Sequence, residues 1–312
     1  MYTITGGGAF TTKNISDINS NFSELSGAGS GASTPLSIWV RPQYGNDSNP
    51  GTYARPLATM GGASQYITPG LTIFVEGVLF EQVTFPIVNN VSVIGVSVVP
   101  RQATTSGVPN GGGATWLSPS SLSNTTALAT VQGQGWSFQN ILFNNSATTA
   151  GCVKLSCVGD PPTSADASQC SFINCHFTGA NLGIDDAGGS YYTTIVGCQF
   201  YNFAGTGDMA IKSTSASLRT PSHWVIQNCR FWGNVNHITI PASAFLITGC
   251  HFTPATTVAI DFTGGVGTNA VVGNYFNIAA DDFDPAGGVT GVTGDVWSNT
   301  LTNAIETGLP AN

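Results

Sequence analysis

The chain has 312 residues, of which 41% are hydrophobic and 8% are charged, and its formal net charge at pH 7 is −8. Charged residues make up about 25% of an average soluble domain, so uncharged polar residues and glycine must cover most of this surface. With eight Lys and Arg residues and no basic cluster, the sequence argues against nucleic-acid binding. No apolar run reaches the ~18 residues that a membrane-spanning helix needs.

The N-terminal residues predict an attachment segment. Gaps of three, four and three separate Ile15, Ile18, Phe22 and Leu25, which places them on one face of a helix of about three turns. A helix this short is marginally stable in water. It must therefore pack on the rest of the chain as a cap, on sister chains, or on a docking partner. We expect attachment to sister chains or to a larger particle, with Phe10 as a further contact residue.

A linker and a capping block follow the predicted helix. Residues 26–35 (SGAGSGASTP) have the composition of a flexible linker. Residues 38–77 predict a strand, a turn at Tyr44–Thr52 and a second strand. We expect this block to cap a stack of strands, because an open end exposes apolar side chains and unpaired backbone. Asp47 and Asn49 have the chemistry to bind Ca²⁺, but shaping the turn is the role that we expect of them.

A six-residue phrase recurs between residues 138 and 276. Each copy reads apolar, variable, Asn or Gly, small or apolar, variable, Phe, as in IQNCRF (226–231). The alternation is that of a strand, and the Asn or Gly suits a corner with left-handed backbone. Gaps of 21 to 34 residues between copies indicate stacked coils with insertions. The closing phenylalanines are Phe143, Phe177, Phe200, Phe231, Phe252 and Phe276.

Such a repeat predicts ladders of like residues, with about 4.8 Å between coils. We expect the phenylalanines to form one inward ladder. Four of the seven cysteines share another column, and we expect them to be buried, reduced fillers because no CxxC metal spacing is present. The odd cysteine count and the lack of a signal peptide favour folding in a reducing cytoplasm. The four cysteines of this column are Cys175, Cys198, Cys229 and Cys250.

Two outward columns carry titratable residues. His176 and His251 share a column but lie three coils apart, roughly 14 Å at the strand spacing, so they cannot share a metal ion, and we expect both to be solvated. In the second strand of each coil, Lys154, Asp185 and Lys212 alternate in sign. We expect them to form a ladder of surface ion pairs.

These features resemble the pectate-lyase-like right-handed parallel β-helix superfamily, in which inward Asn, Cys and Phe ladders are common. The turn at Gly45–Thr52 also matches a Gly-x-Asp-x-x-Pro-Gly-Thr pattern of that superfamily, although Leu57 replaces the usual Phe of the next step. The resemblance covers roughly residues 36–278. It implies an all-β fold, a single-stranded right-handed parallel β-helix with a short N-terminal helix and capping segments, the last of them at residues 279–312.

The superfamily includes lyases, hydrolases, adhesins and phage spikes, so the fold alone does not define a function. Catalysis on polysaccharides generally needs two or three carboxylates in one groove. Asp185 and Asp186 weakly resemble the paired aspartates of polygalacturonase-like hydrolases, yet the neighbouring coils offer Lys154 and Lys212 instead of a second acid. Asp208 lies in a Gly-Thr-Gly-Asp turn, where we expect it to serve the backbone. We therefore predict no enzymatic activity, no catalytic residue, no metal site and no cofactor.

Four tryptophans leave alternatives open. They could stack on sugar rings, contact another subunit or pack in the core, and we expect subunit contact or core packing. The four are Trp116, Trp136, Trp224 and Trp232.

Residues 1–35 resemble short N-terminal segments of bacteriophage virion proteins that precede a β-helix. The resemblance implies a virion structural protein, a homotrimeric capsid decoration (cement or head-fibre) protein assembled in the cytoplasm of the host bacterium. It would dock through residues 1–35 on the major capsid protein or another virion component, with no membrane or nucleic-acid partner. The alternative is a tailspike-like or secreted protein that binds or depolymerises a polysaccharide.

Overall fold

In the computed structural model the chain divides into two compact units, Met1–Pro35 and Leu36–Asn312. The first unit lies outside the described residues, and with it the expected contact residues Phe10, Ile15, Ile18, Phe22 and Leu25. The structure describes residues 36–96, 114–121, 123–157, 165–179, 181–213, 219–253, 258–262, 268–277, 289–290, 296–301 and 305–307.

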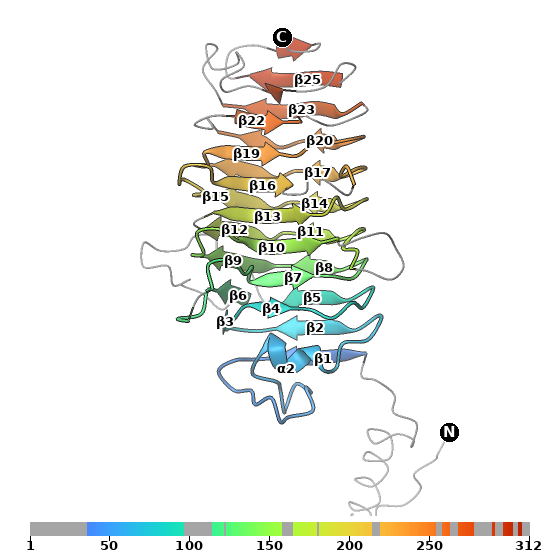
Figure 1. Cartoon of the computed structure of the whole chain (residues 1–312), viewed down its shortest axis with the longest axis vertical. Helices are drawn as coiled ribbons and strands as arrows, with labels where there is room; N and C mark the ends of the chain where they lie inside the picture. The colour runs from blue at the N-terminus through green and yellow to red at the C-terminus, as the bar shows by residue number, and fades with distance from the viewer. Residues whose placement is uncertain are drawn as a thin grey trace, which may run out of the picture. The chain divides into compact units, whose positions relative to one another are not determined.

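The second unit is a right-handed parallel β-helix, as the repeat and the resemblance predict (Figure 1). Each coil supplies short strands at up to three positions, which we call rows 1, 2 and 3, and strands of one row pair in parallel from coil to coil. Row 1 contains β1 (Ser37–Val40), β2 (Thr72–Val75), β5 (Ser92–Gly95), β8 (Ser137–Gln139), β11 (Ser171–Ile173), β14 (Thr194–Val196), β17 (Val225–Gln227) and β20 (Leu246–Thr248). Row 2 contains β3 (Val78–Phe80), β6 (Ala114–Leu117), β9 (Ile141–Asn145), β12 (His176–Gly179), β15 (Gln199–Tyr201), β18 (Arg230–Trp232) and β21 (His251–Phe252).

Row 3 forms a separate sheet. It contains β4 (Val83–Thr84), β7 (Ala129–Val131), β10 (Gly151–Ser156), β13 (Leu182–Ala187), β16 (Met209–Ser213), β19 (Asn236–Thr239), β22 (Val258–Asp261) and β24 (Val289–Thr290). The longer strands β23 (Ala270–Phe276) and β25 (Val296–Leu301) continue rows 1 and 2 together. Among the described strands, only β25 and β26 (Ile305–Thr307) pair antiparallel. The segment expected to be the C-terminal cap therefore contributes strands to the same sheets.

The corner between rows 1 and 2 has left-handed backbone in successive coils, as the repeat predicts. Its residues are Asn140, Asn174, Gly197, Asn228, Gly249 and Gly273, with φ between 52° and 66°. The side chain of Asn228 covers the next coil, because a Cβ added at Gly249 would lie 2.3 Å from its Oδ1 atom. At this pair of coils, asparagine in one coil thus leaves no room for a Cβ at the corner of the next.

The phenylalanine ladder runs through row 2 inside the molecule. Its six members, Phe143 to Phe276 in the repeat, are fully buried and lie in register. The ring centroids of neighbours in the ladder are 4.6–5.2 Å apart, with interplanar angles of 10° or less. Offset stacking of buried rings adds about 0.5–1.5 kcal/mol per pair to the transfer energy, so this ladder holds successive coils at a fixed spacing.

The cysteine column lies at the start of row 2, and its four thiols are buried and free of disulfides. Each thiol donates to a carbonyl of the preceding coil, as Cys198 Sγ does to Phe172 O at 3.4 Å and Cys250 Sγ to Ile226 O at 3.6 Å. Asn274 continues the column. Its Nδ2 atom donates to Ile247 O at 2.9 Å, and its Oδ1 atom accepts from Cys250 N at 2.9 Å. Cysteine and asparagine therefore fill one structural role, in which a polar tip joins two coils.

The capping block covers the first coil with a short helix, α2 (Met60–Ser64). Asp47 accepts hydrogen bonds at its Oδ1 atom from Ala58 N and Thr59 N, each at 2.9 Å, so it shapes the turn as expected. Glu81 accepts from Met60 N and Gly61 N at 2.7 and 3.0 Å and thereby satisfies the free amides of the helix start.

Candidate functional site

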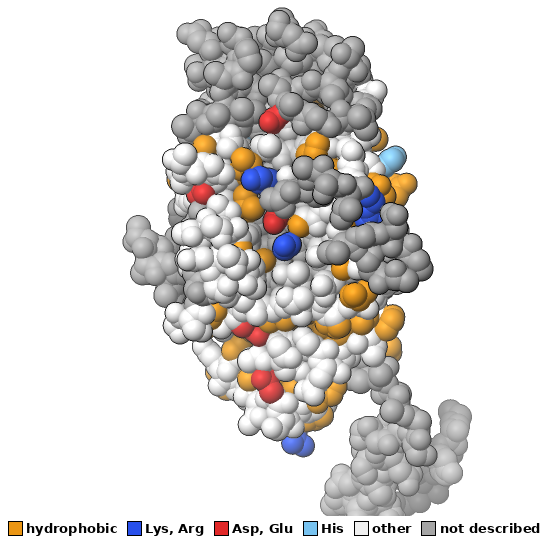
Figure 2. Space-filling model, viewed as in Figure 1, with side chains coloured by type: hydrophobic (Ala, Val, Ile, Leu, Met, Phe, Trp, Pro, Cys, Tyr) orange, Lys and Arg blue, Asp and Glu red, His pale blue; other side chains and the backbone are white. Residues whose placement is uncertain are grey.

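The outer face of row 3 carries the charged column that the sequence predicts. Lys154, Asp185 and Lys212 lie in register on β10, β13 and β16. Figure 2 shows this face, where charged side chains lie one at a time on a mainly uncharged surface. Asp185 is only 8% exposed, so the expectation of a solvated surface ladder is wrong at this position. Lys154 and Lys212 flank it in register on the neighbouring strands.

Asp186 points to the opposite side of the same strand. Successive residues of a strand face opposite sides of the sheet, and Asp186 lies in register with the buried Leu155. Its Oδ1 atom accepts from Ser190 N at 2.9 Å and its Oδ2 atom from Ser213 Oγ at 3.2 Å. Burial raises the pKa of this carboxyl to about 6. Asp185 and Asp186 are thus separated by the sheet and do not form a catalytic pair.

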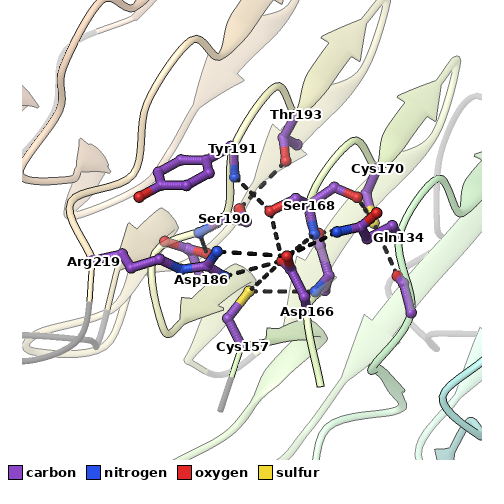
Figure 3. A network of polar contacts seen from close by, with 12 residues as sticks. Gln134, Cys157, Asp166, Ser168, Cys170, Asp186, Ser190, Tyr191, Thr193 and Arg219 are labelled. Atoms are coloured by element: carbon purple, nitrogen blue, oxygen red, sulfur yellow. Dashed lines mark hydrogen bonds and ion pairs between the residues drawn. The ribbon is translucent and has the colours of Figure 1, made fainter. Parts of the chain in front are cut away.

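A polar cluster lies at the corners that lead from row 3 into row 1 (Figure 3). At its centre Asp166 accepts from Arg219 Nη2 at 3.0 Å, from Gln134 Nε2 at 2.9 Å and from Ser168 Oγ at 2.6 Å. The guanidinium of Arg219 also lies 4.8 Å from the centre of the Tyr191 ring. These residues precede β8, β11, β14 and β17, so one carboxylate joins four successive coils.

The electrostatics of this cluster favour a fixed charge on Asp166. Burial alone would raise the pKa of Asp166, but hydrogen bonds from Arg219, Ser168 and Gln134 outweigh it and hold that pKa well below its usual range. Asp166 is 7% exposed. A buried, ionised carboxylate with a guanidinium partner and further hydrogen bonds from Gln134 and Ser168 acts as a structural tie, and proton transfer would require it to lose those partners.

Three other acids, Asp208, Asp47 and Glu81, serve the backbone. Asp208 Oδ2 accepts from Gly205 N at 2.7 Å, so it closes its own turn as the sequence predicts. Asp47 and Glu81 hold the capping block in the same way. Within the described ranges, no group of three His, Cys, Asp or Glu side chains is placed to hold a metal ion, and no helix there is long and apolar enough to cross a membrane.

Three of the four tryptophans pack in the core. Trp116, Trp136 and Trp224 are fully buried, and each indole N–H donates to a backbone carbonyl at 2.7–3.0 Å. Sugar stacking at these three residues is therefore ruled out. Trp232 differs, because it lies partly exposed on the outer face of row 2, where its ring stacks on Tyr201 at 4.7 Å.

The histidines depart most from the sequence prediction. His176 is 5% exposed, so the expectation that it is solvated is wrong, whereas His251 is partly exposed. His237, for which the sequence analysis predicts no role, is fully buried between the rings of Phe231 and Phe252. Its ring nitrogens contact Asn234 Nδ2 at 3.1 Å and Thr253 O at 2.8 Å. Burial lowers its pKa to about 4, so this imidazole is neutral near pH 7.

Aligning the neighbouring strands of row 3 in the sequence could have predicted that His237 is buried. It precedes Ile238 as Ala210 precedes Ile211 on the neighbouring strand β16, and those isoleucines pair. The column is otherwise filled by small residues, so an imidazole there must enter the core and needs hydrogen-bond partners inside it.

No family model matches the chain, and no curated protein matches it at a significant level. Solved structures with a similar fold include pectate lyase Pel9A, with 15% identity, a TM-score of 0.46 and coverage of 88% of this chain and 79% of that chain. The pectin methylesterase from carrot has 12% identity, a TM-score of 0.49 and coverages of 89% and 85%. ORF18 of Geobacillus virus E2 has 12% identity, a TM-score of 0.37 and coverages of 95% and 66%. The strand pairing within this chain defines a parallel β-helix, and at these identities the similarity to the solved structures concerns the fold alone.

Proposed function

We propose that the protein is a structural component of a bacteriophage virion, a homotrimeric β-helix that decorates the capsid as a cement or head-fibre protein. The observation that carries this proposal is the arrangement of the acids. Asp185 and Asp186 lie on opposite faces of β13, and Asp47, Asp166, Asp208 and Glu81 each accept hydrogen bonds that hold turns, caps or neighbouring coils. Asp47, Asp166, Asp208 and Glu81 are therefore used to hold the body together, and Asp185 and Asp186 are not placed to act as a pair.

Attachment falls to residues 1–35 in this proposal. A short helix with one apolar stripe is marginal alone and gains stability when it packs on a surface, at about 1.5–3 kcal/mol per large apolar side chain buried. A homotrimer carries three such segments on flexible linkers. Linked binding events raise the overall affinity by roughly 10²–10⁴ without any new contact, so three weak segments suffice to hold one rigid body on a particle.

A second candidate function rests on the outer face of row 2. Tyr201 and Trp232 stack there with Arg230 and His251 on the same face, and aromatic rings beside a cation are suited to binding a polysaccharide. Release of reducing or unsaturated sugar ends from a host polysaccharide would favour this tailspike-like function over the structural one.

The test of the structural function is the copy number of this chain in purified particles, measured by quantitative mass spectrometry against the major capsid protein. A number comparable with the capsid protein supports decoration, a few trimers per particle indicate a tail or vertex appendage, and absence overturns the virion role. A variant that lacks residues 1–25 should keep the melting temperature of the full chain and lose its place on the particle. Loss of folding in that variant would overturn the attachment role.

A further inference from the structure

Row 1 presents to its outer face a surface without a charged residue. We call this surface the uncharged strip. It consists of the outward residues Ser37, Trp39, Thr72, Phe74, Ser92, Ile94, Ser137, Gln139, Ser171, Ile173, Thr194, Val196, Val225, Gln227, Leu246, Thr248, Ala270 and Val272. All of them are at least partly exposed, and their neighbours along each strand are buried. The outer faces of rows 2 and 3, in contrast, carry Arg230, Lys154 and Lys212.

One end of the strip is aromatic. Trp39 stacks on Phe74 at 4.9 Å, and the Tyr53 ring contacts Trp39 edge-on at 4.8 Å. Arg41 lies over the Tyr53 ring at 4.9 Å and is neutralised by Glu76, with Nε–Oε2 at 2.9 Å. Tyr53 is nevertheless 57% exposed. Tryptophan, tyrosine and arginine are the residues that contribute most to protein interfaces, and here the charge beside them is already balanced within the chain.

A strained corner places a further aromatic ring at the edge of the strip. Tyr192 and His223 have φ of 57° and 58° and stand two residues before β14 and β17, a place where the other coils also have left-handed backbone, at Gly70, Asn90, Gly135, Gln169 and Ala244. A left-handed backbone at a bulky residue costs free energy and persists where the surrounding structure uses it. The two rings stack at 4.8 Å, and Tyr192 is 55% exposed. The corner before β14 therefore presents an exposed aromatic ring at the edge of the strip.

The repeat of the strip identifies its occupant. Its nine strands stack about 4.8 Å apart, so it is ~40 Å long and ~15 Å wide, a footprint of about 600 Å² before edge residues are added. A stable interface buries roughly 800 Å² per partner. A second copy of this chain has the same step per strand along the whole length of the strip and brings no charge to be buried against it, so we infer that it is the occupant.

We propose that the uncharged strip is the contact surface between copies of this chain, which pack in parallel and in register around an axis along the β-helix. This inference rests on the homotrimer of the proposed function and names the surface that forms it. Parallel packing brings the aromatic ends of the copies together. It also brings together the copies of Leu36, which lies directly before the strip and is 85% exposed. Antiparallel packing would instead set Trp39 against the small side chains of Ala270 and Val272.

The first experiment uses engineered cysteines in the full chain. All seven native cysteines are buried, so a cysteine on the outer face is the reactive one. Ser171→Cys lies in the strip, and Thr130→Cys lies on the outer face of row 3 as the matched control. Under mild oxidation we expect covalent dimers from Ser171→Cys and single chains from Thr130→Cys. Equal cross-linking of the two variants, or none at Ser171→Cys, overturns the proposal.

The second experiment measures sedimentation of the isolated full chain. The wild type should assemble, and the double variant Ile173→Asp, Val196→Asp should sediment as a single chain, because like charges would meet across the interface. Thr130→Asp should assemble as the wild type does. A wild type that sediments as a single chain, or a double variant that assembles, overturns the proposal. If the double variant does not fold, the cross-linking experiment alone decides whether the strip is the contact surface. Both measurements use the isolated chain. They therefore test the contact surface even if the copy number in purified particles overturns the virion role.

Discussion

Arg219 and Asp166 form an ion pair between corners that lie two coils apart, with 3.0 Å between Nη2 and Oδ1. The pair spans the intervening coil, whose Tyr191 N donates to Ser168 Oγ at 2.9 Å beside it. Both charged side chains are at most 10% exposed, so neither charge has water to replace its partner.

Removal of one partner should therefore destabilise the fold. We expect Arg219→Ala to lower the free energy of unfolding by about 2–4 kcal/mol, because it leaves a buried carboxylate without its cation. Asp166→Asn in the same chain should recover part of the loss. The measurement is urea unfolding, with the exposed Arg55→Ala as a control that should change stability by less than about 0.5 kcal/mol. Equal stability of Arg219→Ala and Arg55→Ala would show that the pair contributes nothing.

The cysteine column should tolerate an amide and reject a charge. Asn274 shows that an amide can fill this column and donate to the preceding coil, so Cys229→Asn should remain folded. Cys229→Asp has the same shape and places an ionised group in the interior, which costs several kcal/mol. We expect Cys229→Asp to unfold or to melt far below Cys229→Asn. Similar melting curves by circular dichroism would mean that the column is open to water.

Two buried groups should give opposite pH dependences. Asp186 has a pKa raised to about 6 from 3.8, so its contribution is complete below pH 3.8 and is lost as the pH rises through 6. His237 has a pKa lowered to about 4 from 6.5, so its contribution is complete above pH 6.5 and is lost as the pH falls through 4. Each shift corresponds to about 3 kcal/mol.

Single variants separate these two effects. The stability of the wild type relative to Asp186→Asn should fall by about 3 kcal/mol between pH 3.8 and pH 6. The stability of the wild type relative to His237→Gln should rise by a similar amount between pH 4 and pH 6.5. Denaturant unfolding at half-unit steps of pH measures both differences, and a flat difference curve for either variant would contradict the corresponding assignment.

The asparagine–glycine corner should behave as a coupled pair. Gly249→Ala adds a Cβ at φ 65° and 2.3 Å from Asn228 Oδ1, so we expect a loss of about 2 kcal/mol or more. Asn228→Gly should relieve the contact and leave only the backbone strain of about 1 kcal/mol. A double-mutant cycle measures the coupling, and strictly additive losses would refute the steric explanation.

Much of the fold follows from the sequence because the repeat imposes it. A left-handed corner admits only Asn or Gly without strain, and a column of phenylalanines at a constant place in the repeat must stack. The same logic explains Asn274, which takes the place of a cysteine with no change of fold.

The errors arise where burial depends on neighbouring coils and side loops. His176 occupies an outward column and is buried nonetheless, and periodicity within a strand carries no information about what covers that face. The cluster around Asp166 joins corners from four coils whose loops differ in length, so no fixed spacing marks it. Asp185 and Asp186 are adjacent in the sequence and suggest a pair of acids. In the structure they lie on opposite faces of the sheet, because successive residues of a strand alternate between its faces.

Sequence order and spatial order coincide throughout the β-helix. Phe200 stacks on Phe177 before it and on Phe231 after it, and the charged column and the cysteine column also connect neighbouring coils. Each new coil therefore finds most of its contacts in the coil synthesised just before it, and the loops to be closed stay short along the chain. Folding can then advance from the capping block at the pace of translation, with the growing end as its template.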